Sequence, residues 1–265
     1  MRAALHASLT PPLLRLPRAR CSYFSGGTSG LGSYGVLAKY KASFVNGFVR
    51  RHAVSSVVEF GCGDGNQLAQ SRYPPYVDYV GFEVSTTMLQ QLRTRFASNS
   101  TMRFLHVSKF DESEHRADLA LSLDVIYHLV EEHVYDAYLR RLFRAAARFV
   151  IVYSSNEDRT DNKRPGSRTY APIHVRHRRF SEWVTKFQPE WQLLKHAQNP
   201  HGCSLDAVGC GKWGTHSFAS FFVYGTNVTR SPARAAALLA AAAAPLPLPL
   251  NSSGSRMDEL AAVSL

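Results

Sequence analysis

The stretch that most constrains the fold is residues 55–65, which read SSVVEFGCGDG. Its first half is rich in β-forming residues, and an apolar run that ends at glycine is typical of a buried strand. Gly61, Gly63 and Gly65 then lack Cβ atoms at alternate positions, which allows a sharp turn and lets a ligand lie against the backbone. We expect residues 66–70 to begin a helix whose free N–H groups point back toward that turn. Strand, glycine turn and helix N-terminus together predict a nucleotide-binding site.

The glycine spacing and two acidic residues distinguish between classes of nucleotide. A dinucleotide fingerprint is G-x-G-x-x-G, but Asn66 stands at its third glycine position, so the pattern is G-x-G-x-G. The carboxylates of Glu59 and Asp64 would repel a pyrophosphate and attract the amine and sulfonium groups of S-adenosylmethionine. These residues argue against an NAD-dependent oxidoreductase. An ordinary strand–helix turn without a ligand remains the simplest alternative.

The stretch E-F-G-C-G-D-G resembles motif I of the class I S-adenosylmethionine-dependent methyltransferases, in a bacterial-type branch that acts on small molecules. The resemblance covers roughly residues 33–225 in ordered elements. It implies S-adenosylmethionine as the cofactor. It also implies an α/β fold, a Rossmann-like, mainly parallel sheet with helices on both faces and a terminal antiparallel hairpin. The cofactor-binding residues that it implies in motif I are Glu59, Gly61, Cys62, Gly63 and Asp64.

A second strand is predicted over residues 77–83, and Glu83 lies 22 positions beyond Gly61. An acid near that distance, at a strand end, can accept both hydrogen bonds of a ribose diol. The resemblance gives Glu83 the same role and places Val84 beside the cofactor. Ser85 is expected to cap the helix that follows.

A Gly/Ser-rich loop precedes the glycine motif and leads into a helix for which Ser33 is a plausible N-cap. The inward face of this helix is predicted to carry Leu37, Tyr40, Phe44 and Phe48. In many class I methyltransferases a segment before motif I folds over the cofactor. The loop either has that role or is a linker.

The remaining elements repeat the strand–helix pattern. Residues 102–107 form a third predicted strand, after which the resemblance places Asp111 near the adenine amine, although a plain surface Asp fits equally. A helix over residues 131–148 and a fifth strand over residues 149–153 follow the fourth strand. Repeated βαβ units predict a mainly parallel sheet with right-handed crossovers. Ser181 is expected to cap a further short helix, and the last two strands are predicted over residues 191–195 and 218–224.

The fourth strand, residues 118–125, leads directly into the segment that we expect to face the methyl donor. In open α/β sheets, ligands gather beyond the carboxyl ends of the strands. The segment resembles motif IV of small-molecule methyltransferases, which implies that Asp124 contacts the cofactor and Tyr127 the substrate. His128 can take a proton from a hydroxyl nucleophile, so it is the candidate catalytic base; a packing or hydrogen-bonding role is the alternative.

The positive charge of the chain is concentrated in two places. The formal net charge is +11, of which residues 1–58 hold +8 and residues 159–179 hold +6, leaving −3 for the rest. The second basic run follows the fifth strand, on the side expected for the methyl acceptor. Arginine forks suit carboxylate or phosphate, and Arg176 and Arg178 share one side of an extended segment. We therefore expect a small, anionic or polyhydroxylated acceptor, with a solvated charge run as the alternative.

Two other functions stay open beside this one. The basic run could instead recruit nucleic acid, which makes a nucleic-acid methyltransferase the less favoured reading, or the fold could bind S-adenosylmethionine without catalysis. Residues 1–22 look like a transit peptide for a mitochondrion or chloroplast, or a disordered leader of a cytoplasmic protein. Residues 23–229 are the predicted methyltransferase domain and residues 230–265 a disordered Ala/Pro-rich tail, whose apolar run is too short to span a membrane. The four cysteines have no metal-binding spacing.

Overall fold

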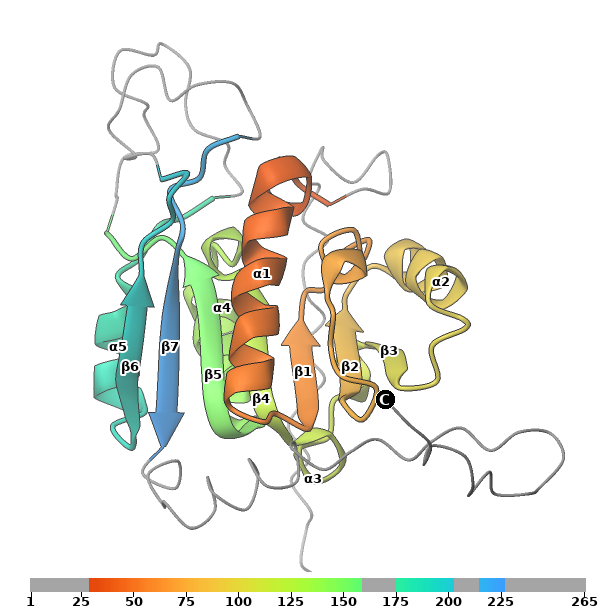
Figure 1. Cartoon of the computed structure of the whole chain (residues 1–265). Helices are drawn as coiled ribbons and strands as arrows, with labels where there is room; N and C mark the ends of the chain where they lie inside the picture. Colours follow the sequence, from red (N-terminus) through yellow and green to blue (C-terminus); the bar gives the residue numbers. More distant parts are fainter. Residues whose placement is uncertain (1–28, 159–174, 203–214, 227–265) are drawn as a thin grey trace, which may run out of the picture.

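The computed structural model of the chain describes residues 29–158, 175–202 and 215–226. Within them lies a seven-stranded sheet with the order β3-β2-β1-β4-β5-β7-β6 (Figure 1). The strands are β1 (Ser56–Phe60), β2 (Asp78–Glu83), β3 (Met102–His106), β4 (Ala117–Leu123), β5 (Ala146–Ser154), β6 (Trp191–Ala197) and β7 (Ser220–Thr226). The first five pair in parallel, whereas β7 runs antiparallel to both β5 and β6. The predicted α/β sheet with a terminal antiparallel pair is confirmed.

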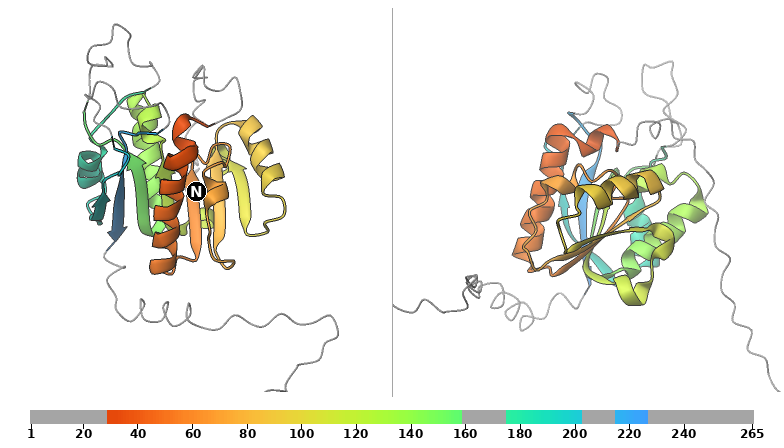
Figure 2. Two further views of the ribbon diagram at one scale, coloured as in Figure 1. Left: turned by 45° about the horizontal axis from the view of Figure 1, so that its top comes forward. Right: turned by 90° about the vertical axis from the view of Figure 1, so that its right-hand side faces the viewer.

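Helices cover both faces of the sheet (Figure 2). The α-helices are α1 (Gly35–Arg51), α2 (Thr86–Arg95), α3 (Glu112–His115), α4 (Glu132–Arg144) and α5 (Phe180–Phe187). Because successive strand residues point to opposite faces, Val57 packs in the cluster with α1 and α2, and Val58 packs with α4 and α5. Burying one such aliphatic side chain contributes roughly 1.5–3 kcal/mol, so the two clusters hold the layers together.

The strand order reverses between β1 and β4. From β1 the chain proceeds to β2 and β3 on one side, and the later strands β4 and β5 lie on the other. β1 and β4 pair directly, with Glu59 opposite Leu121. The loops that leave these two strands therefore diverge at the carboxyl edge of the sheet. In open α/β sheets this reversal point is where ligands bind.

The glycine turn forms as predicted, but the helix expected after it does not. Gly61, Gly63 and Gly65 all have positive φ angles, between 60° and 83°. Residues 66–70 contain only the 3-10 turn η3 (Leu68–Gln70) in place of a helix. Pro74 and Pro75 explain this difference, since they leave no room for a regular helix before β2 begins.

Other boundaries also differ from the predictions. The helix predicted to reach residue 148 ends at Arg144, because Ala146 already pairs with Ala117 of β4. The predicted cap Ser181 lies inside α5, whose N-cap is Arg179. The backbone N–H of Ser181 donates to the side-chain oxygen of Asn156.

Helix α1 also starts differently. Its N-cap is Tyr34 rather than Ser33, because the 3-10 turn η2 (Leu31–Ser33) takes up the preceding residues. Ser85 does cap α2 as predicted, since its Oγ accepts the N–H of Met88 at 3.3 Å.

Several predictions fall on residues outside the described ranges. These are the leader over residues 1–22, the tail over residues 230–265 and most of the basic run, residues 159–174. They remain predictions, as does the division of the chain at residues 23 and 229. No helix among the described residues is long and apolar enough to cross a membrane.

Candidate functional site

The Glu83 carboxylate organises the edge of the sheet where β1 and β2 end. Its Oε2 accepts the backbone N–H of Gly63 at 2.9 Å, and its Oε1 accepts the N–H groups of Val84 and Ser85 at 2.8 and 3.0 Å. The side chain is buried, whereas Val84 next to it is 53% exposed. A carboxylate offers about four lone-pair positions, so Glu83 can accept a further hydrogen bond while holding these three. An apolar side chain beside it is open to a ligand.

Glu59 lies beneath the glycine turn, on the face of the sheet that α1 covers. Its Oε2 accepts the hydroxyl of Tyr79 at 2.7 Å. Burial raises the pKa of Glu59 to about 6, against the opposing effects of the Tyr79 hydrogen bond and the charge of Lys41. Glu59 is opposite Gly81 in the β1–β2 pairing, where the missing side chain makes room for the Cys62 thiol.

The Cys62 thiol is part of this packed floor. Its Sγ lies 3.9 Å from the carbonyl oxygen of Phe82, and burial raises the pKa of the thiol well above its usual value. The predicted role of Cys62 at the cofactor therefore concerns its backbone and small volume rather than a reactive thiolate.

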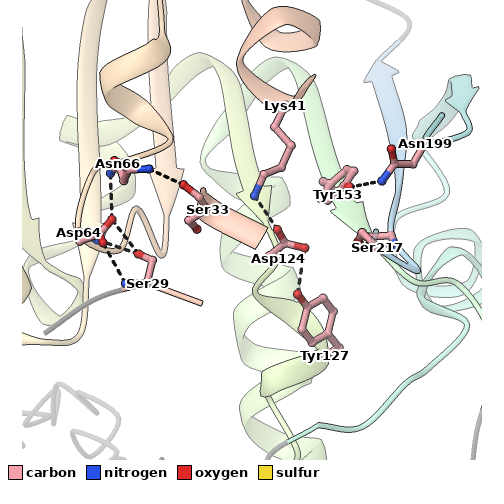
Figure 3. Close-up of polar contacts among 11 residues, drawn as sticks. Ser29, Ser33, Lys41, Asp64, Asn66, Asp124, Tyr127, Tyr153, Asn199 and Ser217 are labelled. Atoms are coloured by element: carbon pink, nitrogen blue, oxygen red, sulfur yellow. Dashed lines mark hydrogen bonds and ion pairs between the residues drawn. The ribbon is translucent and has the colours of Figure 1, made fainter. Parts of the chain in front are cut away.

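The segment before α1 folds onto the glycine turn through Asp64 (Figure 3). The Asp64 carboxylate accepts the N–H and Oγ–H of Ser29, the hydroxyl of Tyr34 and the N–H of Asn66. Burial raises the pKa of Asp64, but the hydrogen bonds from Tyr34, Ser29 and Asn66 outweigh it and lower that pKa overall. Ser29 Oγ lies only 2.1 Å from the position that a Cβ on Gly63 would take. The chain from Ser29 to α1 therefore lies directly over motif I, and its predicted role of covering the cofactor remains a prediction.

A second polar group lies where β4 ends (Figure 3). The ammonium of Lys41, from α1, contacts Asp124 Oδ2 at 2.6 Å, and the Tyr127 hydroxyl donates to Asp124 Oδ1 at 2.9 Å. Asp124 has a φ of 61°, a left-handed conformation that Asp tolerates better than most residues. Burial and the Asp124 carboxylate raise the pKa of Tyr127 well above its usual value. Asp124 and Tyr127 were predicted site residues, whereas Lys41 was not.

A third group of polar side chains follows β5. The Tyr153 hydroxyl accepts a hydrogen bond from Nδ2 of Asn199 at 2.6 Å, and Ser155 Oγ lies 2.7 Å from Nδ1 of His177. The rings of His177 and Tyr127 both lie against Phe218, with centroids 4.7 and 5.1 Å away. The sequence reasoning missed these residues, although Tyr153 and Ser155 lie at a predicted strand end, where the carboxyl-edge rule could have identified them.

The candidate base His128 and the candidate adenine ligand Asp111 are both exposed. His128 ends the 3-10 turn η5 (Ile126–His128), is exposed, and has its ring centroid 4.5 Å from that of Tyr127. Asp111 is an exposed N-cap of α3, where hydrogen bonds from Ser113 lower its pKa. Its contacts are thus those of a capping residue.

Arg176 and Arg178 lie on the same side of their segment, as predicted. Both guanidinium groups donate to the carbonyl oxygen of Val130, and Arg178 also donates to that of Leu129 at 2.8 Å. Arg176 lies 3.0 Å from the Glu132 carboxylate. The Arg178 guanidinium packs over the ring of Tyr135 at 4.3 Å. Both arginines thus bind groups of the protein itself.

Comparison with known proteins identifies the type of domain. A family described as "Methyltransferase domain" matches residues 57–148. The methyltransferase domain of bacterial CtHen1-C has a TM-score of 0.51 at 17% identity, over 71% of this chain and 97% of that one. The N-methyltransferase NodS from Bradyrhizobium japonicum WM9, in complex with S-adenosyl-L-homocysteine, has a TM-score of 0.52 at 14% identity, over 72% and 87%.

The small RNA methyltransferase HEN1 has a TM-score of 0.50 at 17% identity, over 72% of this chain but 25% of its own. No curated protein sequence matches this chain. At these identities the solved structures show a common fold, and they leave the methyl acceptor open.

Proposed function

Because the chain belongs to the class I S-adenosylmethionine-dependent methyltransferases, we propose that it transfers a methyl group to a small polyhydroxylated or anionic acceptor. The observation that carries the acceptor proposal is a group of polar and aromatic side chains at the ends of β4 and β5: the half-buried Tyr127 and the buried Tyr153, Ser155, His177 and Asn199. This group lies next to the strand-order reversal, where the cofactor is expected.

The residues at the ends of β1 and β2 fit the cofactor. Glu83 keeps acceptor capacity for a ribose diol, exposed Val84 offers an apolar surface beside it, and the turn at Gly61–Gly65 provides a backbone without side chains. The cofactor supplies a methyl group on a positively charged sulfonium, which the carboxylates of this edge attract. The protein's own contribution is then to orient the acceptor and exclude water.

With the cofactor bound, the acceptor oxygen would form its new bond to the methyl carbon as the sulfonium S–C bond breaks, and the acceptor's proton would have to leave. We propose that His128 receives this proton, because it lies at the carboxyl end of β4 next to Tyr127. His128 is exposed, which gives the proton a path to solvent.

The arginine contacts favour the polyhydroxylated acceptor over the anionic one. Arg178 donates to two carbonyl oxygens and Arg176 pairs with Glu132. Both guanidinium groups are therefore already bound to the protein, which disfavours a role in binding a carboxylate or phosphate. The half-buried Tyr127 offers a hydroxyl group for a hydrogen bond with a polyol, and aromatic rings suit the apolar face of a sugar or phenol.

The test is methyl transfer from S-adenosylmethionine labelled on its methyl group. Purified full-length protein is incubated with four separate pools: sugars and polyols, hydroxylated aromatics, small di- and tricarboxylates, and total RNA. Mass spectrometry then locates the label. A label in either hydroxyl pool supports the proposal, and a label in the carboxylate pool supports its anionic form.

Three results would contradict the proposal or the cofactor site on which it depends. Label found mainly in RNA, with transfer falling steeply as salt rises, would establish the nucleic-acid alternative. Tight binding of S-adenosylhomocysteine without label in any pool would favour the non-catalytic alternative. Failure to bind S-adenosylhomocysteine at all would contradict the assignment of the cofactor site.

A further inference from the structure

A lysine occupies a core position of α1. The inward stripe of this helix contains Leu37, Ala38, Ala42 and Val45, and Lys41 lies in the middle of it with 1% of its surface exposed. Burying an ammonium group is costly unless the group is paired. Replacing a buried ion pair by well-packed apolar residues is often neutral or stabilising. A contribution to folding stability is therefore a weak explanation for a lysine at this buried position.

The position of Lys41 coincides with the reversal of the strand order. Its Nζ contacts Asp124 Oδ2 at the end of β4, and it lies 5.4 Å from the ring centroid of Tyr153 at the end of β5. Gly32 covers the same carboxylate, since a Cβ at Gly32 would come within 2.9 Å of Asp124 Oδ2. In the part of the chain that the structure describes, Asp124 is the hydrogen-bond partner of Lys41.

The chemistry of the three groups fixes the direction of each hydrogen bond. An ammonium can only donate, so Asp124 accepts from Lys41. A carboxylate only accepts, so the Tyr127 hydroxyl must donate its hydrogen to the other oxygen of Asp124. The lone pairs of the Tyr127 oxygen are then left to accept from a third group.

We propose that Lys41 is a positioning residue that, through Asp124, sets the Tyr127 oxygen as a hydrogen-bond acceptor for an O–H or N–H group of the acceptor molecule, beside the group whose proton His128 receives. This inference rests on the proposed function, because it concerns the acceptor of that reaction. It specifies the acceptor further: next to the group to be methylated, it must carry a second group with a hydrogen that it can donate to Tyr127. A carboxylate would meet lone pairs at this point and be rejected.

The Asp124→Asn variant reverses the arrangement without changing its shape. Lys41 then donates to the amide oxygen, and the amide N–H₂ faces Tyr127 and donates to it. The Tyr127 O–H turns outward as a donor. Lys41→Met tests the other end of the chain of contacts, and the Lys41→Met/Asp124→Asn double variant removes both charges together. Lys39→Met is the matched control, because Lys39 is an exposed lysine on the same helix.

Two readouts decide the inference. The first needs no ligand: NMR of protein labelled at the tyrosine Cζ, with Tyr127→Phe to assign the signal, reports whether the Tyr127 oxygen donates or accepts. The Cζ signal shifts in one direction when the phenol oxygen donates a hydrogen bond and in the other when it accepts one. We expect the Tyr127 signal to differ from that of the wild type in Asp124→Asn and Lys41→Met, but not in Lys39→Met. An unchanged signal in both variants would overturn the inference.

The second readout is methyl transfer to the pool compound that the wild type labels fastest. We expect Asp124→Asn, Lys41→Met and Tyr127→Phe to raise the KM of this compound at least tenfold. Lys41→Met and Tyr127→Phe should keep S-adenosylhomocysteine affinity within twofold of wild type. The double variant should be no worse than Asp124→Asn alone, because both changes act through one carboxylate. Variants that fold and keep the wild-type KM contradict the inference, whereas a wild type that labels no pool contradicts the proposed function instead.

A comparison of KM with S-adenosylhomocysteine affinity separates positioning from mere structural support. Loss of the fold would weaken the binding of both compounds, whereas loss of positioning in Lys41→Met raises the KM of the acceptor and leaves S-adenosylhomocysteine affinity in place. If Lys41→Met does not fold, Asp124→Asn and the double variant still decide the question.

Discussion

The Glu83 carboxylate accepts the backbone N–H of Gly63 at 2.9 Å, across 20 positions of sequence. This bond ties the end of β2 to the glycine turn after β1. Since the other oxygen of Glu83 accepts two more N–H groups, one buried side chain holds both strand ends in register. A residue expected only to bind a ribose diol thus also determines the shape of the turn that meets the cofactor.

Glu83→Ala should weaken S-adenosylhomocysteine binding by about 1–3 kcal/mol, because it leaves buried N–H groups without an acceptor and removes the predicted diol contact. Calorimetry measures the affinity, and thermal denaturation of the free protein measures the effect on the turn. Glu114→Ala, an exposed acid on α3, is the control. Unchanged affinity in Glu83→Ala would place the ribose elsewhere.

Gly63→Ala should disturb the segment before α1 more than the strand itself. A Cβ there would lie 2.1 Å from Ser29 Oγ, on a backbone with a φ of 60° that costs an L-residue about 1–2 kcal/mol. We expect a lower melting temperature and weaker S-adenosylhomocysteine binding. Combining it with Ser29→Ala should recover part of the loss.

The same substitution at a glycine of α1 should change stability in the opposite direction. Gly47 lies within the helix, and a Cβ there would meet no atom within 4 Å. Gly47→Ala should therefore stabilise the protein by roughly 0.5–1 kcal/mol, since alanine is the better helix former. A destabilising Gly47→Ala together with a neutral Gly63→Ala would contradict the geometry described for both positions.

Stability should depend on pH through Glu59. Its pKa is raised by burial from 4.5 to about 6, so the folded state binds a proton that the unfolded state has already released. The stabilisation is fully present below pH 4.5 and is lost as pH rises through 6, at most about 2 kcal/mol for a shift of this size. Urea denaturation between pH 4.5 and 7 measures it. Glu59→Gln should flatten this part of the profile, and an unchanged slope would assign the effect to another group.

The fold could be predicted because its signals are local. The alternation of Val57 and Val58 between two packing clusters follows from strand geometry, and the Ser85 cap follows from its place before an apolar stripe. The helix expected from Asn66 failed for an equally local reason, the two prolines before β2.

The missed site residues depend on contacts between distant parts of the chain. Lys41 has the charge of a surface residue, and its burial is decided by Asp124, 83 positions later. Tyr153 and Asn199, which bond in the interior, are 46 positions apart. No periodicity within either segment reports such a pairing, because the register of the sheet and the tilt of α1 decide which side chains meet.

The last prediction separates the three neighbouring arginines. Arg178 has a side chain that is 10% exposed and donates to two carbonyl oxygens, so Arg178→Ala should cost roughly 1.5–3 kcal/mol of unfolding free energy. Arg176→Ala and Arg179→Ala remove exposed ion pairs, each worth about 0–1 kcal/mol. Urea denaturation ranks the variants, and the KM of the labelled acceptor in each reports any contact with it. If Arg178→Ala is as stable as the wild type but its KM for the acceptor rises at least tenfold, Arg178 binds the acceptor after all. If the variant is destabilised and its KM is unchanged, the role of Arg178 is to hold the segment after η5 in place.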